Sequence, residues 1–456
     1  MFSSNTYVQR RAALKQKIGS GVLLFMGNDD MGLNYEDNAF RYRQDSTFLY
    51  YFGLSAAGLN AIIDIDEDRE IIFGDELTID SIIWMGTLPS LKSRAAEVGI
   101  TDVRPAAELT DYLRTAKSKR TVHYLPPYRP EHKLKLMDWL GLAPAEQTGS
   151  IPFIKGVIAQ RNYKTDEEIA EIERACDVTA DMHIKAMQVI RPGMYEYEVV
   201  AEMNRVAEMN NCQLSFPTIA SINGQTLHNH YHGNQIKSGQ LFLIDAGCET
   251  EMGYAGDMSS TVPVDKTFTS RQRAVYEIQN AMHLGAVSAL RPGIPYMEVY
   301  DLSARIMVDG MKALGLMKGN AEDAVREGAH ALFYPHGLGH MMGLDVHDME
   351  NLGEVWVGYA GQPKSTQFGR RSQRLAIPLE PGFVFTVEPG VYFIPELIDL
   401  WRGEKKFTDF INYDKVEEYR HFGGIRNEED YLITPTGARR LGKKIPLTPD
   451  EVEALR

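Results

Sequence analysis

The stretch that decides the fold is residues 189–199, VIRPGMYEYEV, which returns one hundred residues later as ALRPGIPYMEV at residues 289–299. Each copy reads as the end of a helix, a Pro-Gly break and the start of a second helix. Self-similarity of this kind predicts two related α-β halves with a cleft at their junction. The alternative is that the two segments are similar by coincidence, because an Arg-Pro-Gly break between two helices is common. If the repeat is real, we expect functional groups from both halves.

Upstream of the repeat, short apolar runs alternate with helical stretches. The strand-like runs are residues 21–26, 60–65, 70–73 and 121–125, and residues 106–116 have helical spacing. A long helix is predicted over residues 163–186, where Thr165 and Glu168 can form a capping box. The alternation of strands and helices predicts a protein of the α/β (α+β) class, and the long helix marks the start of a second domain. The protein has an N-terminal α/β domain at residues 1–160 and a catalytic domain at residues 161–456.

Composition narrows the class of protein. A chain of 456 residues, 44% of them hydrophobic, can bury a large core and favours two domains. The net charge of -14 argues against nucleic acid or an anionic membrane surface as a partner. Three widely spaced cysteines indicate neither a disulfide framework nor a zinc finger. With no signal-like apolar region and no run of 18 apolar residues, we predict a cytoplasmic protein that does not cross a membrane.

Two aspartates follow one another at the ends of strand-like segments. Asp245 closes the apolar run LFLI at residues 241–244, and Asp257 follows the glycine-marked turn GYAG at residues 253–256. An Asp at a strand end is usually a turn or capping residue, so each alone says little. Together they predict a hairpin that presents two carboxylates.

Histidines and glutamates supply the remaining polar groups of interest. The segment PHGLGHMMGLDVH at residues 335–347 holds His336, His340 and His347, which are hard to explain as packing in a chain with only twelve histidines. Glu388 ends the strand-like run VFTV before Pro-Gly, and Glu428 lies between Gly-Gly and an apolar strand. An exposed glutamate cluster is normally solvated surface, but this sequence context is not typical of a surface tract.

Five of these side chains form a candidate ligand set: Asp245, Asp257, His340, Glu388 and Glu428. A carboxylate-rich set suits hard or borderline divalent cations. Four crowded carboxylates would repel one another unless cations neutralised them. Two ions roughly 3.5–4 Å apart would hold a water between them and lower its pKa toward neutrality. We therefore predict a hydrolase with two divalent ions, Mn²⁺ in first place and Co²⁺ or Zn²⁺ as alternatives.

The order of the ligands and the sequence motifs around them resemble those of the pita-bread metallopeptidases of the proline-specific branch, prolidase and aminopeptidase P. These motifs are HGLGH at residues 336–340, DVHD at 345–348, TVEPG at 386–390 and GIRNE at 424–428. The resemblance covers the whole chain and implies a pseudo-symmetric pita-bread catalytic domain after the N-terminal domain. FRYRQDS at residues 40–46, WMG at 84–86 and the long connection from 392 to 424 look most like prolidases, which cleave Xaa-Pro dipeptides.

The resemblance also implies roles for single residues. Glu388 binds one ion and shuttles a proton, and Glu428 bridges the two ions. His336, His347 and His228 contact the substrate or stabilise the oxyanion, with His230 as a competitor of His228. The implied substrate-binding residues are Arg374, His230 and Arg426, with Arg374 at the substrate carboxylate. The partners implied are Xaa-Pro dipeptides or short peptides and a second copy of the chain in a homodimer.

Three positions depart from the family pattern. Asp245 and Asp257 are twelve residues apart, one more than usual, which predicts a bulge or a longer turn. Phe216 stands where prolidases often carry Tyr, so a hydroxyl near the ions is missing. Asn427 replaces an aliphatic residue, and its side chain, which faces away from the ions, is expected to matter little.

Three alternatives to a prolidase are open. They are aminopeptidase P activity on longer peptides, metal-free creatine hydrolysis on the same scaffold, and a binding protein that kept the fold and lost catalysis. The presence of all five ligands speaks against the last two.

Overall fold

A five-stranded sheet forms the centre of the N-terminal unit of the computed structural model, which describes residues 1–456. This unit comprises residues 1–161 and 349–356. Its sheet has the order β6-β5-β4-β1-β7. The strands are β1 (Val22–Met26), β4 (Asn60–Asp64), β5 (Arg69–Phe73), β6 (Asp102–Arg104) and β7 (Val122–His123), and β2 (Gly32–Tyr35) and β3 (Asn38–Ala39) form a separate hairpin. The helices are α1 (Ser4–Ile18), α2 (Ser46–Phe52), α3 (Ile79–Met85), α4 (Leu91–Glu97), α5 (Glu108–Lys117), α6 (Pro130–Leu140) and α7 (Ile151–Arg161).

Alternate residues of β1 explain how helices cover both faces of this sheet. Val22 and Leu24 share a core with residues of α5 and α6 such as Leu113 and Leu136. Phe25 points to the other face, where its ring packs against the aromatic rings of α2 and α7. Both faces are therefore buried, as the uninterrupted apolar character of β1 predicts.

The sequence predictions for this unit hold with small shifts. Strands form at all four predicted runs, and the predicted helix at residues 106–116 is observed as α5. The run 121–125 is paired only over Val122 and His123. It ends before Pro126 and Pro127, which lack the N–H that a longer ladder would need. The segment 349–356, which the sequence division assigns to the second domain, groups with the first unit, where Lys155 lies 4.9 Å from the Trp356 ring centroid.

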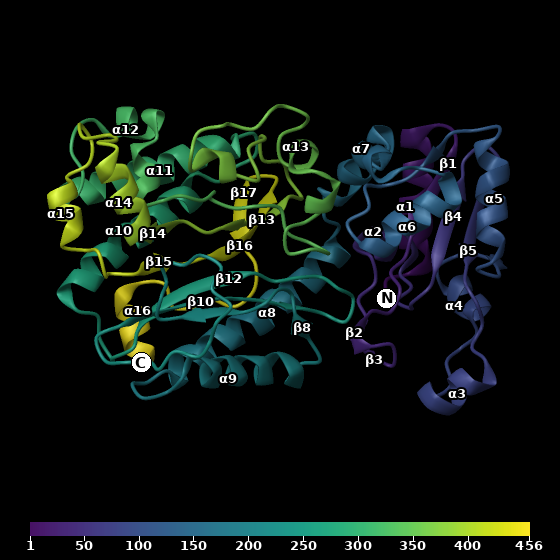
Figure 1. The fold of residues 1–456 in the computed structure, drawn as a ribbon, viewed down its shortest axis with the longest axis horizontal. Coiled ribbons are helices and arrows are strands. Elements are labelled where there is room, and N and C mark those ends of the chain that lie inside the picture. The colour runs from purple at the N-terminus through teal and green to yellow at the C-terminus, as the bar shows by residue number, and fades with distance from the viewer. The chain divides into compact units, whose positions relative to one another are not determined.

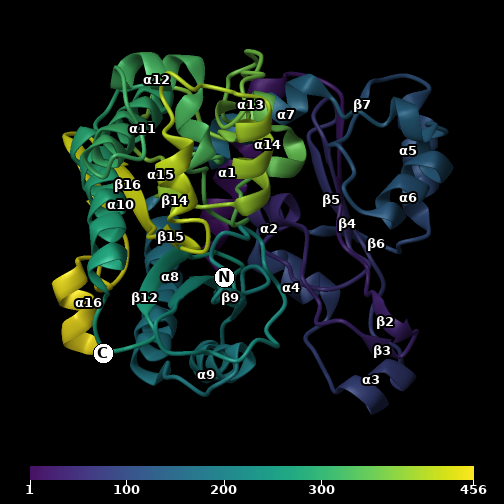
Figure 2. The same cartoon turned by 60° about the vertical axis from the view of Figure 1, so that its left-hand side comes forward.

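The C-terminal unit, residues 162–348 and 357–456, contains two copies of one α-β arrangement. Its helices are α8 (Asp166–Val189), α9 (Glu196–Met209), α10 (Ser270–Ala289), α11 (Tyr296–Ala313), α12 (Ala321–Glu327), α14 (Pro395–Gly403), α15 (Tyr413–Glu417) and α16 (Pro449–Leu455). Its strands are β8 (Gln213–Leu214), β9 (Ile219–Ser221), β10 (Leu241–Ala246), β11 (Cys248–Glu249), β12 (Met258–Pro263), β13 (Val384–Val387), β14 (Gly390–Tyr392), β15 (Gly424–Arg426), β16 (Glu429–Thr434) and β17 (Gly437–Arg440). Figure 1 shows the helix pair α8 and α9 below β10 and β12, and Figures 1 and 2 show α10 beside α11. None of the chain's helices combines the length and the apolar character that crossing a membrane requires.

The predicted repeat is confirmed at the level of single hydrogen bonds. Gly193 follows α8 with φ +95° and donates to the Ile236 carbonyl, while Gly293 follows α10 with φ +83° and donates to the Leu379 carbonyl. Helix α8 begins at Asp166, three residues later than predicted, because Thr165 is its N-cap and forms the predicted capping box. Thr269 caps α10 in the same way. The two helix pairs are thus equivalent, including the Pro-Gly breaks between them.

The first hairpin presents its two aspartates on one face. The pairing register of β10 and β12 sets Asp245 opposite Ser259 and continues unchanged to the bridge between Glu249 and Ala255. Residues 251–253 then form the turn. The longer turn is therefore observed and the bulge is not. Because faces alternate with each residue, Asp257, two residues before Ser259, shares a face with Asp245.

The second hairpin sets its two glutamates opposite each other. Val387 pairs with Glu429 in β13 and β16, and Gly390 pairs with Arg426 in β14 and β15. This register is the same on both sides of a short gap in the ladder, so Glu388 and Glu428 lie directly across from one another. A bridge between Ser259 and Glu428 joins this hairpin to the first.

We expect Gly193→Ala and Gly293→Ala each to lower the free energy of unfolding by about 1–2 kcal/mol, because L-residues resist this backbone conformation. An added Cβ at either position meets nothing within 4 Å, so the positive φ is the only penalty. Urea unfolding measures the effect. Gly403→Ala is the control: it also points into open space, but it lies in α14 without a positive φ and should be neutral or slightly stabilising. Clearly unequal losses at the two breaks would contradict their equivalence.

Candidate active site

A cavity of about 250 Å³ opens in the C-terminal unit, and its wall contains every site residue that the sequence predicts. These residues are His228, His230, Asp245, Asp257, His336, His340, His347, Arg374, Glu388, Arg426 and Glu428. Phe216, Leu227 and Val346 add apolar surface, and Phe216 brings no hydroxyl. The polar groups come from both halves of the repeat, as expected from the duplication.

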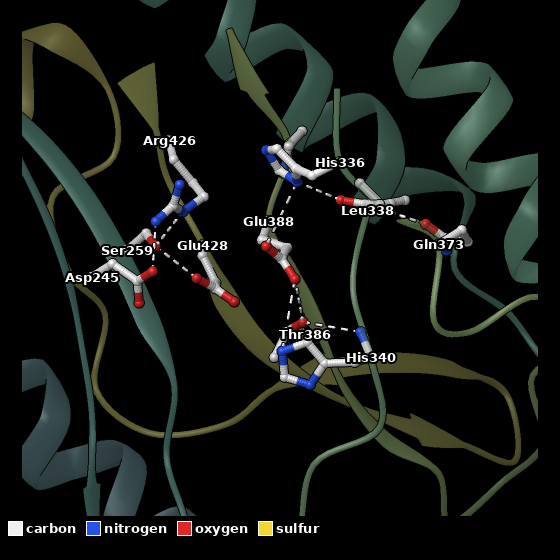
Figure 3. A network of polar contacts seen from close by, with 12 residues as sticks. Asp245, Ser259, His336, Leu338, His340, Gln373, Thr386, Glu388, Arg426 and Glu428 are labelled. Atoms are coloured by element: carbon white, nitrogen blue, oxygen red, sulfur yellow. Dashed lines mark hydrogen bonds and ion pairs between the residues drawn. The ribbon is translucent and has the colours of Figure 1, made fainter. Parts of the chain in front are cut away.

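Three buried side chains at the floor of the cavity can share one cation. The ligand atoms of Asp257, His340 and Glu428 all lie within 4.8 Å of one another. His340 Nε2 is 3.3 Å from an oxygen of Asp257 and 3.7 Å from an oxygen of Glu388. Figure 3 shows Glu428 between Asp245 and Glu388, so that the carboxylates of both hairpins converge on one space.

The negative charge of this cluster is only partly compensated by the side chains around it. Burial, together with the Asp245 carboxylate, holds the pKa of Asp257 well above its usual range. Burial and the neighbouring carboxylates do the same to the pKa of Glu428, and burial raises the pKa of Glu388 to about 7. Asp257 Oδ1 is buried and has no hydrogen-bond partner. Divalent cations would supply the missing positive charge and occupy this oxygen, so the residues fit a metal centre.

Arg426 partly balances the cluster from one side. Its guanidinium donates to Asp245 Oδ2 at 2.5 Å, to Ser259 Oγ at 2.9 Å and to the Tyr392 hydroxyl at 2.8 Å. Ser259 in turn donates to Glu428 Oε2 at 2.7 Å. Arg426 is only 4% exposed. These contacts make it a residue that orients Asp245 and, through Ser259, Glu428, in addition to the substrate contact predicted for it.

Hydrogen bonds define the orientations of two histidines. His340 Nδ1 donates to the Met341 carbonyl at 3.0 Å, which presents the Nε2 lone pair toward Asp257. His336 Nδ1 donates to the Gly337 carbonyl at 2.7 Å, and its Nε2 accepts from the Tyr392 hydroxyl at 2.9 Å. Burial and the positive charge of Arg426 lower the pKa of His336 to about 3, so this imidazole is neutral. His347 lies against His340, with ring centroids 4.2 Å apart.

Other predicted residues lie at the solvent side of the cavity. His228 and His230 both line the cavity and are both exposed, so their positions do not favour one over the other as the upstream histidine of the site. Arg374 is half-buried in the same wall. Its position allows it to meet a charged group of a substrate that enters the cavity.

Several supporting residues were missed in the sequence. Thr386 Oγ1 accepts from the His340 amide at 3.2 Å and lies 3.5 Å from Glu388 Oε1, and the Gln373 side chain accepts from the Leu338 amide at 2.6 Å. Tyr392 and Ser259 complete the Arg426 network described above. A signal existed for three of them, because Thr386, Tyr392 and Ser259 stand an even number of residues from a ligand along a strand. For Gln373 the sequence offers none.

Comparisons with known proteins agree on one family. Residues 170–435 match the model of metallopeptidase family M24, and residues 7–124 match the aminopeptidase P N-terminal domain. An Xaa-Pro aminopeptidase of Escherichia coli (strain K12) is 31% identical, over 99% of this chain and 98% of the relative. An Xaa-Pro dipeptidase of Rattus norvegicus is 29% identical, over 96% and 88% respectively.

Solved structures are similar over the full chain as well. Zn-substituted E. coli aminopeptidase P in complex with product has a TM-score of 0.82 and 30% identity, over 100% of this chain and 98% of that one. Proline aminopeptidase P II from Yersinia pestis has a TM-score of 0.83 and 29% identity, over 100% and 99%. The two-part architecture and the paired halves described above are thus those of known peptidases.

We expect the metal-free protein to lose thermal stability as the pH rises from about 5 to 8. The folded-state pKa values of Asp257, Glu428 and Glu388 lie above their unfolded values, so the folded state binds protons more tightly. The stability that this gives is present at low pH and is lost as the pH passes the folded pKa, about 7 for Glu388. Calorimetry after chelator treatment measures the change.

Two controls accompany this measurement. Excess Mn²⁺ should flatten the pH dependence and stabilise the protein most at pH 8. Metal-free Glu428→Gln should melt above the metal-free wild type at pH 8, because it removes one buried like charge. A melting temperature of the metal-free wild type that stays level or rises with pH would show that the cluster is not strained by charge.

Proposed function

Because the chain belongs to metallopeptidase family M24, we propose that it hydrolyses the peptide bond that precedes proline, foremost in Xaa-Pro dipeptides, with two divalent cations. The strongest single support is the cavity itself. Its wall joins the five predicted ligands, four further histidines and two arginines around a volume of about 250 Å³, a size suited to a small peptide.

The substrate bond explains why a dedicated site is needed. An Xaa-Pro bond is a tertiary amide without an N–H, and the proline ring fixes the backbone, so peptidases that bind an extended chain through that N–H hold it poorly. Proteins similar to this chain carry the names Xaa-Pro aminopeptidase and Xaa-Pro dipeptidase. Both names describe hydrolysis at this same bond.

The cation ligands in this proposal are Asp245, Asp257, His340, Glu388 and Glu428. When bound, two divalent ions supply a water nucleophile that is acidified toward neutral pH and an electrophile for the carbonyl oxygen. Glu388 takes the proton of that water and passes it to the prolyl nitrogen.

The remaining polar residues contact the substrate. His228, His336 and His347 all line the cavity; in this proposal His228 and His347 donate hydrogen bonds to the oxyanion, and His336 contacts the bound peptide. Arg374 binds the substrate carboxylate. Only a dipeptide places its C-terminus one residue beyond the scissile bond, so an arginine at that distance selects dipeptides.

Aminopeptidase activity on longer peptides is the second candidate. It is favoured by the 31% identity to the E. coli Xaa-Pro aminopeptidase and by the TM-scores of 0.82 and 0.83 to solved aminopeptidase P structures. The two functions share the reaction and differ in the length of peptide that the cavity accepts.

We also propose Mn²⁺ as the native ion, a homodimer and a cytoplasmic location. The oxygen-rich ligand set suits Mn²⁺. A second copy would cover the apolar side chains of α3, since Ile79, Ile83 and Trp84 are 72%, 70% and 84% exposed. Cys176, Cys212 and Cys248 are all unpaired, which is typical of a reducing compartment.

Chelator-stripped protein resupplied with Mn²⁺ should release proline from Ala-Pro, with kcat/KM higher than for Ala-Pro-Ala. The charged C-terminus of the dipeptide meets Arg374, and that of the tripeptide does not. Stripped protein without metal is the control and should be inactive. A preference for the tripeptide would assign the second candidate, and inactivity toward both peptides would contradict the proposal.

Glu388→Gln should lower kcat on Ala-Pro by about 10²–10⁴-fold, because the amide cannot accept the proton of the attacking water. Metal content must be measured in parallel, since Glu388 is also a proposed ligand. Full activity in a variant that retains two ions would exclude Glu388 as the proton shuttle.

A further inference from the structure

Helices α8 and α10 bear buried polar side chains at equivalent positions behind the two hairpins. The four residues are Thr179 and His183 on α8 and, one hundred positions later, Gln279 and His283 on α10. Residues four apart share one face of a helix. In the first half, Thr179 accepts from the Cys248 amide at 3.1 Å and His183 Nε2 is 3.0 Å from the Ala246 carbonyl oxygen. This helix therefore bonds to the main chain just beyond Asp245.

In the second half, Gln279 reaches both strands that carry the glutamates. Its Nε2 donates to the Pro389 carbonyl at 2.7 Å, next to Glu388. Its Oε1 accepts from the Asn427 Nδ2 at 2.5 Å, next to Glu428. Gln279 and Asn427 are 0% and 1% exposed, so these bonds form away from water.

Asn427 also reaches the first half of the repeat. Its Oδ1 accepts from the Thr261 amide of β12 at 3.1 Å and from the Tyr276 hydroxyl at 3.3 Å. An aliphatic side chain at this position would leave the Thr261 amide and the Gln279 carbonyl without these partners. Asn427 thus joins β12, α10 and the second hairpin at a single point.

The link matters because the ladder is interrupted there. The Glu388 amide donates to the Leu338 carbonyl and the Glu428 amide to the Ser259 carbonyl, so the two residues do not bond to each other. Pro389 has no N–H to offer. Across this gap, Gln279 and Asn427 supply the connection between the two strands.

We propose that Gln279 and Asn427 form an amide pair that positions the Glu388 and Glu428 carboxylates, and that this pair sets how tightly the cations are held. The pair lies on the face opposite the carboxylates and touches neither cation nor substrate, so its members are positioning residues. This inference rests on the proposed function for the presence of cations. It revises the expectation that Asn427 matters little to the ions.

Titration calorimetry of chelator-stripped protein with Mn²⁺ tests the pair. Asn427→Leu and Gln279→Met should each weaken Mn²⁺ binding by about 10-fold or more, the usual effect of removing support behind metal ligands. The double variant should bind about as weakly as the poorer single one, because either change breaks the same link. Wild-type binding in both single variants would overturn the proposal.

Ile278→Ala is the matched control for a general loss of stability. Ile278 lies on the same helix but packs against Gly310 of α11, away from the hairpin. It should lower the melting temperature and leave Mn²⁺ affinity at the wild-type value. If Ile278→Ala weakened Mn²⁺ binding as much as the amide variants, a specific positioning role would be excluded.

Two further outcomes are distinguishable. If Asn427→Leu does not fold, the Mn²⁺ affinity of Gln279→Met, which keeps the length of the side chain, still tests the proposal. If the wild type itself binds no Mn²⁺, the proposed function fails before the amide pair is tested. If the wild type binds Mn²⁺ and releases proline from Ala-Pro while the variants bind equally well, only the amide pair is contradicted.

Discussion

The repulsion among four carboxylates gathered at the meeting point of two hairpins is the constraint on which the rest of the C-terminal unit depends. Asp245, Asp257, Glu388 and Glu428 converge there with one neutralising guanidinium, that of Arg426. Side chains in water would move apart. Strand pairing, the helix side chains behind the hairpins and the bonds from Ser259 and Arg426 prevent this, and they keep the charge concentrated for cations to neutralise.

The two halves hold their carboxylates in place with the same arrangement of helices and strands but with different side chains. The first hairpin offers short aspartates diagonally across its ladder, and the second offers longer glutamates directly opposite each other. The supporting helices differ as well, since Thr179 bonds only to Cys248, through its amide and its thiol, whereas Gln279 bonds to both Pro389 and the Asn427 side chain. Duplication therefore supplied the framework, and divergence within it made the two sides of the centre chemically distinct.

Local patterns in the sequence were enough to find the strands that carry Asp245 and Glu388, the repeat and the charged residues that line the cavity. Asp245 and Glu388, for example, each end a strand-like run, and this signal does not depend on distant residues. Features that depend on partners far along the chain could not be found. The sequence assigned no role to the Asn427 side chain because its partners, Thr261 and Gln279, are 166 and 148 residues away. The grouping of residues 349–356 with the N-terminal unit was invisible for the same reason.

The ion pair between Arg426 and Asp245 has a consequence for how this protein matures. An internal guanidinium already compensates part of the negative charge, so the chain can reach its folded form before any metal arrives. Cations can then enter a site whose carboxylates are already in place. An oxygen-rich centre filled after folding accepts whichever suitable cation is abundant around it. Its occupancy then reports the metal supply of its surroundings as much as its own sequence.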